Sequence, residues 1–307
     1  MTQDRPILGI ALMFGFCLVA PLGDALTKLL STTMPLGFLL LMRFSIQGWL
    51  LAPLVLITGR PWRMNQRVLR LTAFRTALHI TGIGGMIIAL KYLPLADAIA
   101  IAFVMPFIML LLGHFVLGEE VGMRRIIACA VGFCGTLLVI QPSFKDVGWP
   151  ALLPLFVAIT FAFFMLVTRQ IAKDTDPIGL QFVSGFMAMA ILIPAMVLGG
   201  VLDIDLLRWP SPTGQEWLLL AVIGVLGTSA HLFMTWSLRY APAATLAPMQ
   251  YLEIPVATVF GYLIFHDLPN GLAAWGICIT IVAGLYIIMR ERAIALAKSE
   301  AERQAPA

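Results

Sequence analysis

Charged residues are scarce in this chain of 307 residues: Asp, Glu, Lys and Arg together make up 12% of it, against about 25% in a typical soluble domain. Apolar residues make up 60%, and the mean hydropathy is +0.95. A soluble fold of this length would therefore need one very large core and almost no polar surface. The composition excludes an ordinary soluble protein and indicates one that is embedded in lipid.

Long polar segments are also missing, since the longest one, residues 203–216, covers only about fourteen positions. Between the polar segments, apolar runs of about 18 to 25 residues recur, and runs of this length can cross a hydrocarbon layer of about 30 Å. The runs are continuous rather than alternating, which favours helices over the strands of a barrel. The sequence thus predicts an all-α integral membrane protein with ten transmembrane helices, at residues 6–28, 35–57, 71–90, 95–117, 125–140, 150–171, 178–198, 217–238, 241–265 and 271–289.

Several motifs that would point to other functions are absent from the sequence. There is no Gly-x-x-x-x-Gly-Lys-Ser/Thr phosphate-binding loop, so ATP-driven pumping by this chain alone is not expected. His-Glu-x-x-His and Gly-x-Ser-x-Gly are absent too, which argues against a membrane hydrolase. The four cysteines lie inside apolar runs without paired metal-ligand spacing, so neither a metal nor a cofactor is expected.

The net charge of +4 comes from basic residues that are unevenly distributed over the loops. If the N-terminus is cytoplasmic, fourteen Lys and Arg residues fall on the cytoplasmic side and four on the opposite side. The larger group is Arg5, Arg60, Arg63, Arg67, Arg70, Arg124, Arg125, Arg169, Lys173, Arg239, Arg290, Arg292, Lys298 and Arg303, and the smaller is Lys28, Lys91, Lys145 and Arg208. Because Lys and Arg collect in cytoplasmic loops, both termini are predicted to be cytoplasmic, and no nucleic-acid partner is needed to explain the charge.

The chain also contains an internal repeat. Residues 90–96 read Leu-Lys-Tyr-Leu-Pro-Leu-Ala, and residues 238–244, which lie 148 positions later, read Leu-Arg-Tyr-Ala-Pro-Ala-Ala. A weaker similarity, at a separation of 141 to 142, relates residues 27–38 to residues 168–180. Repeats of this kind indicate duplicated structural units, so the chain is expected to consist of two related halves.

The domain organisation follows from this repeat. A first five-helix repeat is expected at residues 1–145, a second at 146–290, and a charged cytoplasmic tail at 291–307. Because five is an odd number, the second half enters the membrane from the opposite side, and the two halves are predicted to be inverted relative to each other. Inverted repeats are typical of secondary transporters, which bind substrate near the bilayer midplane between the halves and work by alternating access.

The ten spans, the repeated basic-Tyr-x-Pro-x-Ala corner and Gly118-Glu119 after the fourth span resemble the EamA-type members of the drug/metabolite transporter (DMT) superfamily. Residues 24–28 and Arg43-Phe44 are similar to the bacterial members, and the resemblance covers nearly the whole chain. At residues 266–267 the second half has His-Asp where the family pattern has Gly-Glu. The resemblance implies a permease of the bacterial inner membrane with a central cavity, related to carriers of amino acids, S-adenosylmethionine and riboflavin.

Glu253 is the first candidate site residue, because an ionisable group inside a span is unfavourable by roughly 2.5–3.5 kcal/mol on insertion scales. It lies about twelve residues, or about 18 Å, into its predicted span. Gln250 is expected one turn earlier on the same face, and Pro248 and Pro255 on either side leave backbone carbonyls free. Glu253 is expected either to bind a cationic group or to carry a proton; the alternative is a protonated side chain hydrogen-bonded within the bundle.

Three more ionisable side chains are predicted in spans of both halves. Arg75 and His79 are four residues apart and share a helix face. Arg75 is expected either to serve the site or to extend to the cytoplasmic surface. His79 and His231 lie deeper, each as a hydrogen-bond or proton partner or as a packing residue.

Asp24, Lys28 and Arg43 complete the candidate set. Asp24 and Lys28 are four residues apart towards the outer end of the first span, and Arg43 lies near the middle of the second. An ion pair between Asp24 and Arg43 would lower the free-energy cost of burying both charges. These residues are therefore expected either to contact substrate or to form a structural clamp.

Together these observations predict a secondary active transporter of a small organic metabolite, without a cofactor. A riboflavin-like vitamin is the first substrate hypothesis, followed by S-adenosylmethionine and amino acids, on the basis of family analogy and an aromatic interior of mixed polarity. The alternative is an integral-membrane enzyme acting on a lipid-linked substrate, which would need Asp or His clusters in membrane-edge loops. Membrane lipid, a coupling proton or ion and a second copy of the chain are the other candidate partners. The direction of transport, the coupling ion and the oligomeric state stay open.

Overall fold

The computed structural model describes residues 5–118 and 122–304, and every regular element in these two ranges is a helix. The elements are α1 (Pro6–Leu30), α2 (Leu36–Thr58), α3 (Gln66–Leu90), α4 (Leu95–Ala102), α5 (Met105–Leu117), α6 (Met123–Val147), η1 (Trp149–Leu152), α7 (Leu153–Ile171), α8 (Pro177–Val201), η2 (Asp205–Leu207), α9 (Gly214–Tyr240), α10 (Ala243–Leu246), η3 (Ala247–Leu252), α11 (Glu253–Phe265) and α12 (Gly271–Gln304). The predicted all-α class is thereby confirmed.

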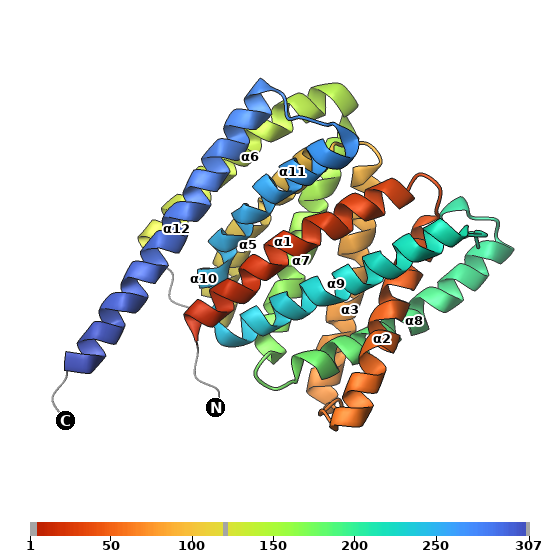
Figure 1. Ribbon diagram of the computed structural model, residues 1–307, viewed down its shortest axis with the longest axis horizontal. Coiled ribbons are helices and arrows are strands. Elements are labelled where there is room, and N and C mark those ends of the chain that lie inside the picture. Colours follow the sequence, from red (N-terminus) through yellow and green to blue (C-terminus); the bar gives the residue numbers. More distant parts are fainter. Residues whose placement is uncertain (1–4, 119–121, 305–307) are drawn as a thin grey trace.

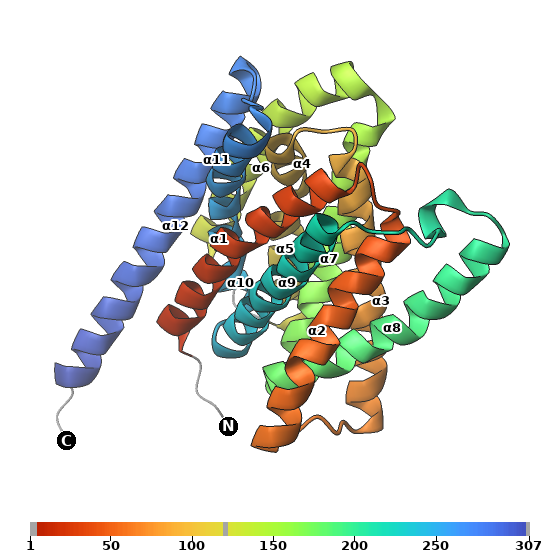
Figure 2. The same ribbon diagram turned by 45° about the vertical axis from the view of Figure 1, so that its right-hand side comes forward.

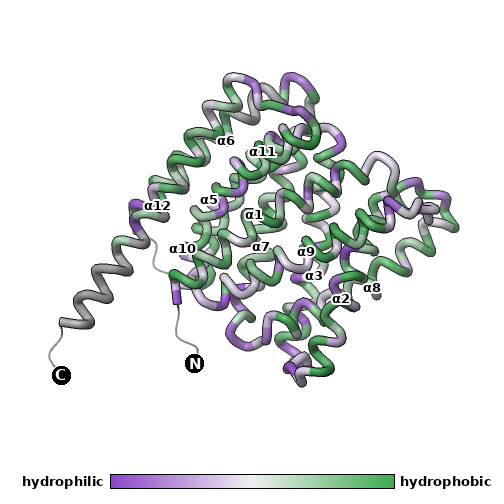
Figure 3. The backbone as a smooth tube through the Cα atoms, viewed as in Figure 1, coloured by the Kyte–Doolittle hydropathy of each residue, from purple (hydrophilic) through white to green (hydrophobic). Residues whose placement is uncertain are grey.

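Seven of the described helical segments are long and apolar enough to cross a membrane, and three shorter apolar helices accompany them. The shorter ones cover Ile126–Leu138, Met249–Phe265 and Gly271–Ala283. Figure 3 shows hydrophobic residues along the helices and hydrophilic residues concentrated at the turns between them. The protein is therefore a multi-pass membrane protein.

Several predicted helix boundaries differ from the structure. Helix α3 begins at Gln66, five residues before the predicted start, and α6 continues to Val147 through a region predicted as a loop. Helix α12 is continuous from Gly271 to Gln304, so the predicted last span and the predicted tail belong to one helix. Hydropathy marks where a segment enters lipid, whereas a helix continues for as long as its backbone hydrogen bonds do, which explains these differences.

The helices pack mainly in pairs that are distant in sequence. Helix α1 lies along α9, α2 along α8, α3 along α7, and α6 along α12 (Figures 1 and 2). The α2–α8 pair is especially close, because a Cβ added to Gly185 would lie only 2.8 Å from the Gly48 backbone nitrogen. Small residues permit such close backbone approach between helices in lipid.

Two faces of the bundle are named below by their chain ends. On the N-terminal face, α1 begins and α9 ends, and the Arg5 backbone N–H donates to the Tyr240 carbonyl at 2.7 Å. On the opposite face, α1 ends near the turn between α3 and α4, where the Lys28 Nζ donates to the Leu93 carbonyl at 2.9 Å.

Two spans that were predicted as continuous helices, at 95–117 and 241–265, are interrupted near their middle. The first ends as α4 at Ala102 and resumes as α5 at Met105, just before Pro106. The second passes from α10 through the 3₁₀ segment η3 before α11 starts at Glu253. Prolines lack the N–H that an α-helix interior requires. Pro106 is the second residue of α5, Pro248 the second residue of η3, and Pro255 the third residue of α11, so all three lie where a helical segment begins. The prediction of two unbroken helices was wrong.

Candidate functional site

A cavity lies where the two interrupted spans meet the rest of the bundle. Its wall includes residues of both halves, from α1, α2, α3, α4, α5, α7, α9 and α11. The space open to the centres of water molecules is about 70 Å³, enough for a few waters. The ionisable side chains in its wall are Asp24, Arg43, His231 and Glu253, and the aromatic ones are Phe16, Phe103 and Phe161 in addition to the His231 ring.

Glu253 lies in the cavity wall as the first residue of α11. Its side chain is nearly buried, and within the described part of the chain no hydrogen-bond donor reaches its carboxyl group. The N-terminus of a helix carries a partial positive charge, which favours an acidic group there. The second interrupted span therefore presents an acid, without a direct partner, to the cavity.

Gln250 lies outside the cavity wall, although it is only three residues from Glu253. Its amide Nε2 lies 3.1 Å from the Met165 sulfur and 3.9 Å from the Met109 sulfur. The predicted shared face for Gln250 and Glu253 is not formed in the cavity, since Gln250 packs among sulfur atoms in the region around η3.

Asp24 and Arg43 both line the cavity, but they do not form the direct ion pair that the sequence suggested. Among the described residues neither side chain has a hydrogen bond or ion pair. The Arg43 guanidinium instead lies against Gly227 of α9. A Cβ added to Gly227 would lie 2.7 Å from the Arg43 Cζ, so the absent side chain leaves the space that the guanidinium occupies.

His231 lines the cavity, and its hydrogen bond defines what it offers there. The ring Nδ1 lies 2.9 Å from the Gly227 carbonyl, and a carbonyl oxygen can only accept, so Nδ1 carries the proton. In the neutral ring Nε2 is then an acceptor, and it has no partner in the described structure. The cavity therefore contains two carboxyl groups and one imidazole acceptor, but only one guanidinium donor.

His79 lies behind His231, with 4.2 Å between the two ring centroids, and is itself outside the cavity wall. Its fully buried ring also packs on Phe164 at 4.5 Å and Phe44 at 5.0 Å. Neither of its ring nitrogens has a partner among the described residues. The two predicted histidines are thus brought together, although only His231 reaches the cavity.

Arg75 and Lys28 are held elsewhere. Arg75 is completely buried and donates to the Thr168 hydroxyl at 2.7 Å and the Ser184 hydroxyl at 3.0 Å. Of the two alternatives for Arg75, the one in which it extends to the cytoplasmic surface was therefore wrong. Lys28 closes the opposite face of the bundle, with its Nζ 3.6 Å from the Asp267 carboxylate. Neither side chain lines the cavity.

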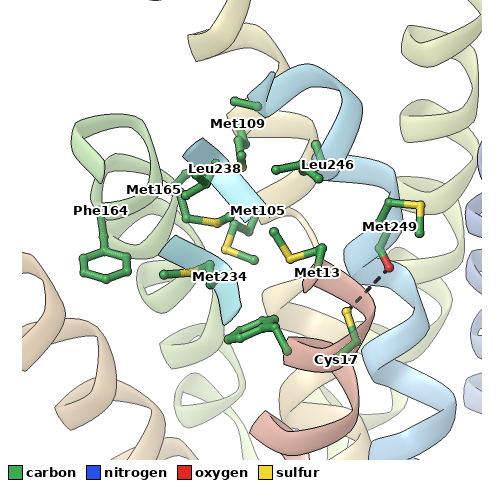
Figure 4. Close-up of a cluster of buried hydrophobic side chains, with 14 of the residues drawn as sticks. Met13, Cys17, Met105, Met109, Phe164, Met165, Met234, Leu238, Leu246 and Met249 are labelled. Atoms are coloured by element: carbon green, nitrogen blue, oxygen red, sulfur yellow. Dashed lines mark hydrogen bonds between the residues drawn. The ribbon is translucent and has the colours of Figure 1, made fainter. Parts of the chain in front are cut away.

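Sulfur-containing side chains fill the space between the cavity and the N-terminal face. They converge from α1, α5, α7, α9 and η3 (Figure 4) and are Met13, Cys17, Met105, Met109, Met165, Met234 and Met249. Met105 belongs both to this sulfur cluster and to the cavity wall. Methionine is flexible and adapts to irregular spaces, so the floor of the cavity is apolar and deformable.

Some contributors to the site were not identified from the sequence. Gly227 could not be recognised, because nothing in the sequence relates it to Arg43. Phe103, by contrast, belongs to the aromatic interior expected from the sequence; the repeat separation of 148 matches it with Tyr251, and the two ring centroids lie 5.5 Å apart. The sulfur cluster had no periodic signal, because its members come from five elements.

The chain belongs to the EamA-like transporter family, whose profile matches it twice, at residues 7–141 and 148–290. It is 25% identical to a Rickettsia prowazekii protein named as an S-adenosylmethionine uptake transporter, over 92% of each chain. It is 29% identical to a Rhizobium johnstonii protein named as a riboflavin transporter, over 76% of this chain and 72% of the relative.

The fold has a counterpart among solved structures. One crystal structure superimposes with a TM-score of 0.68 over 94% of this chain and 98% of the other, at 18% identity. At that identity the likeness concerns the fold alone. Family membership, two transporter-named relatives and the apolar helices identify the protein as a transmembrane metabolite transporter of the EamA/DMT type.

Proposed function

We propose that this protein is a secondary active transporter that moves a small organic metabolite by alternating access, with ten spans arranged as two inverted halves of five. The helix pairing supports this proposal. If the halves are exchanged, α1 takes the place of α7 and α9 that of α3, so the α1–α9 pair becomes the α7–α3 pair. The α2–α8 and α6–α12 pairs become themselves. All four pairs occur in the bundle, as expected for a two-fold relation between residues 1–145 and 146–290.

The interrupted spans give a second line of support. They occupy corresponding places in the two halves, at a sequence separation of 148, and both contribute to the cavity. Phe103 and Tyr251, which this separation matches, contact each other. Paired discontinuous helices are the usual indication of the substrate site in transporters with inverted repeats. This observation carries the proposal.

The bacterial inner membrane, with both termini cytoplasmic, is the proposed location. The N-terminal face carries basic residues in and beside the turns between the helices: Arg5, Arg60, Arg63, Arg67, Arg124, Arg169, Lys173 and Arg239. The opposite face has far fewer Lys and Arg residues. The bias of Lys and Arg towards cytoplasmic loops supports this orientation.

The cavity favours a substrate that carries cationic nitrogen or sulfur and at least one anionic group. Asp24, Glu253 and the Nε2 of His231 accept hydrogen bonds or attract positive charge, and Arg43 can bind a carboxylate. S-adenosylmethionine and amino acids have this combination, and one relative is named for S-adenosylmethionine. We therefore place them before riboflavin, which the sequence alone had ranked first.

A riboflavin-like vitamin is the second candidate. Phe16, Phe103 and Phe161 line the cavity and offer faces on which a planar ring system can stack. A relative named as a riboflavin transporter supports this alternative. The enzyme alternative has less support, because the relatives are named as transporters and the ionisable groups line a cavity within the helices rather than the membrane-edge loops.

Uptake into proteoliposomes tests the proposal. Labelled S-adenosylmethionine, riboflavin and a panel of amino acids would be supplied with and without an imposed proton gradient, and protein-free liposomes serve as the control. We expect saturable uptake of a zwitterion with cationic character, and acceleration by the gradient if a proton is coupled. Saturable uptake of riboflavin alone would favour the second candidate. No uptake of any compound in either direction would contradict transport by this protein.

A further inference from the structure

Arg75 is a buried charge for which the described structure provides no counter-charge. The side chain has no accessible surface, and no acidic group of the described residues forms an ion pair with it or interacts with its charge. Arg43, the other arginine that is buried among the described side chains, differs because it shares the cavity wall with the acids Asp24 and Glu253. Fully buried arginines are almost always paired, and an uncompensated buried charge is strongly destabilising.

The surroundings of Arg75 contain donors that lack acceptors. The guanidinium Nη2 has no partner, while Nε and Nη1 donate to Thr168 and Ser184. The Thr168 hydroxyl donates to the Phe164 carbonyl at 2.7 Å. The Ser184 hydroxyl accepts from Arg75, and its own proton is given to no described acceptor.

His79 adds a third donor beside the same aromatic wall. The Arg75 Cζ lies 4.4 Å from the Phe164 ring centroid, and the His79 ring lies 4.5 Å from it. Either tautomer of His79 carries one N–H, and neither ring nitrogen has a described partner. The free groups are thus donors, and the missing component is an acceptor with negative charge.

We propose that a small inorganic anion, chloride or one of similar size, binds beside Arg75, where the guanidinium Nη2, the Ser184 hydroxyl and the His79 N–H act as donors. Hydrogen bonds from a guanidinium to an anion are charge-assisted and strong. Because Arg75 does not line the cavity, this anion is separate from the transported substrate. It joins α3 to α8, and thus the first half of the chain to the second.

Thermal unfolding of the purified full-length protein in detergent tests this site. The midpoint would be measured by tryptophan fluorescence in sodium chloride and in sodium gluconate at equal ionic strength. A ligand that binds only the folded state raises stability with the logarithm of its concentration once the site is nearly saturated. We therefore expect the midpoint to rise with chloride concentration and to stay lower in gluconate. Equal midpoints in the two salts would overturn the proposal.

Two variants separate a specific site from a general salt effect. Arg75→Gln removes the charge and is expected to abolish the difference between chloride and gluconate, whereas Arg43→Gln, which changes an arginine with an acid nearby, should retain it. A chloride dependence that persists in Arg75→Gln would refute the site. If Arg75→Gln does not fold, Ser184→Ala keeps the charge and removes one donor. The chloride concentration for half of the stabilisation should then rise severalfold, and an unchanged value would count against the proposed donors.

Discussion

The two interrupted spans occupy equivalent places in the two halves but differ in chemistry. At the repeat separation of 148, Met105 at the start of α5 corresponds to Glu253 at the start of α11. Both residues line the cavity, yet one offers a thioether and the other a carboxyl group. The comparison teaches that the repeat accounts for the position of the site, whereas residue identities that differ between the halves account for its charge.

The interruptions also differ in length. In the first half only Phe103 and Val104 separate α4 from α5, whereas in the second half the six residues of η3 separate α10 from α11. A 3₁₀ segment has poorer hydrogen-bond geometry than an α-helix, and long 3₁₀ runs are uncommon. The backbone of the second interrupted span is therefore expected to rearrange more easily than that of the first when the bundle changes conformation.

The largest predicted effect comes from removing the charge difference between the two interrupted spans. Glu253→Gln removes the acid of α11 and should lower uptake at limiting substrate about 10- to 100-fold, because a hydrogen bond to a charged group contributes about 1.5–3 kcal/mol and each 1.4 kcal/mol is a factor of ten. Proteoliposome uptake would measure it. Met105→Leu, at the matched position of the first half, is the control and should change uptake less than about threefold. Equal losses in both variants would show that the asymmetry has no functional meaning.

A smaller effect is predicted where the second half accommodates the Arg43 side chain of the first. Gly227→Ala would place a Cβ 2.7 Å from the Arg43 Cζ, and the displaced guanidinium should weaken the apparent substrate affinity about tenfold, the equivalent of one charged hydrogen bond. Overpacking should also lower the free energy of unfolding by about 1–3 kcal/mol. Substrate-dependent uptake and thermal unfolding measure the two effects.

Gly224→Ala is the matched control for this prediction. It lies about one turn away on α9, and its Cβ would lie 2.6 Å from the Ile46 Cβ, so it overpacks an apolar contact instead. Stability should fall in a similar way while substrate affinity stays unchanged. An unchanged affinity in Gly227→Ala as well would mean that the position of Arg43 does not matter for binding.

The smallest predicted effect concerns the far end of the second interrupted span, where Asp267 pairs with Lys28. The Asp267 side chain is 41% exposed and the Lys28 side chain 17%, and ion pairs near a surface contribute about 0–1 kcal/mol. A double-mutant cycle of Lys28→Met and Asp267→Asn, followed by thermal unfolding, should yield a coupling energy within that range. A coupling energy above about 2 kcal/mol would show that this ion pair contributes substantially to the stability of the opposite face. Glu119, which corresponds to Asp267 in the first half, lies outside the described residues.

Much of the architecture could be predicted from the sequence, because hydropathy and repeat spacing can be read along the chain without knowledge of its tertiary contacts. The all-α class was predicted correctly, and the family was recognised from the repeated corner and the spans. The interruptions were missed: continuous hydropathy in residues 95–117 and 241–265 does not distinguish one helix from two. The prolines were visible, but whether a proline bends, breaks or merely begins a helix depends on what packs beside it.

The candidate residues show the same limit. Asp24, Arg43, His231 and Glu253 were found because ionisable groups in lipid stand out individually. That these four share a cavity, while Arg75, His79, Lys28 and Gln250 lie outside its wall, could not be derived from spacing along single helices. Helix periodicity gives the face of a residue, whereas the cavity depends on how eight elements are placed against one another.

The sequence by itself indicated a helical membrane protein with a duplicated chain, because hydropathy and repeat spacing can be read along the chain without its tertiary contacts, and the resemblance to the EamA-type family implied transport. The tertiary structure decided where the interruptions meet, which charges share the cavity, that Gly227 makes room for Arg43 and that Arg75 is buried without an acid. Those features depend on contacts between residues up to about two hundred positions apart. Only packing in three dimensions can bring such residues together.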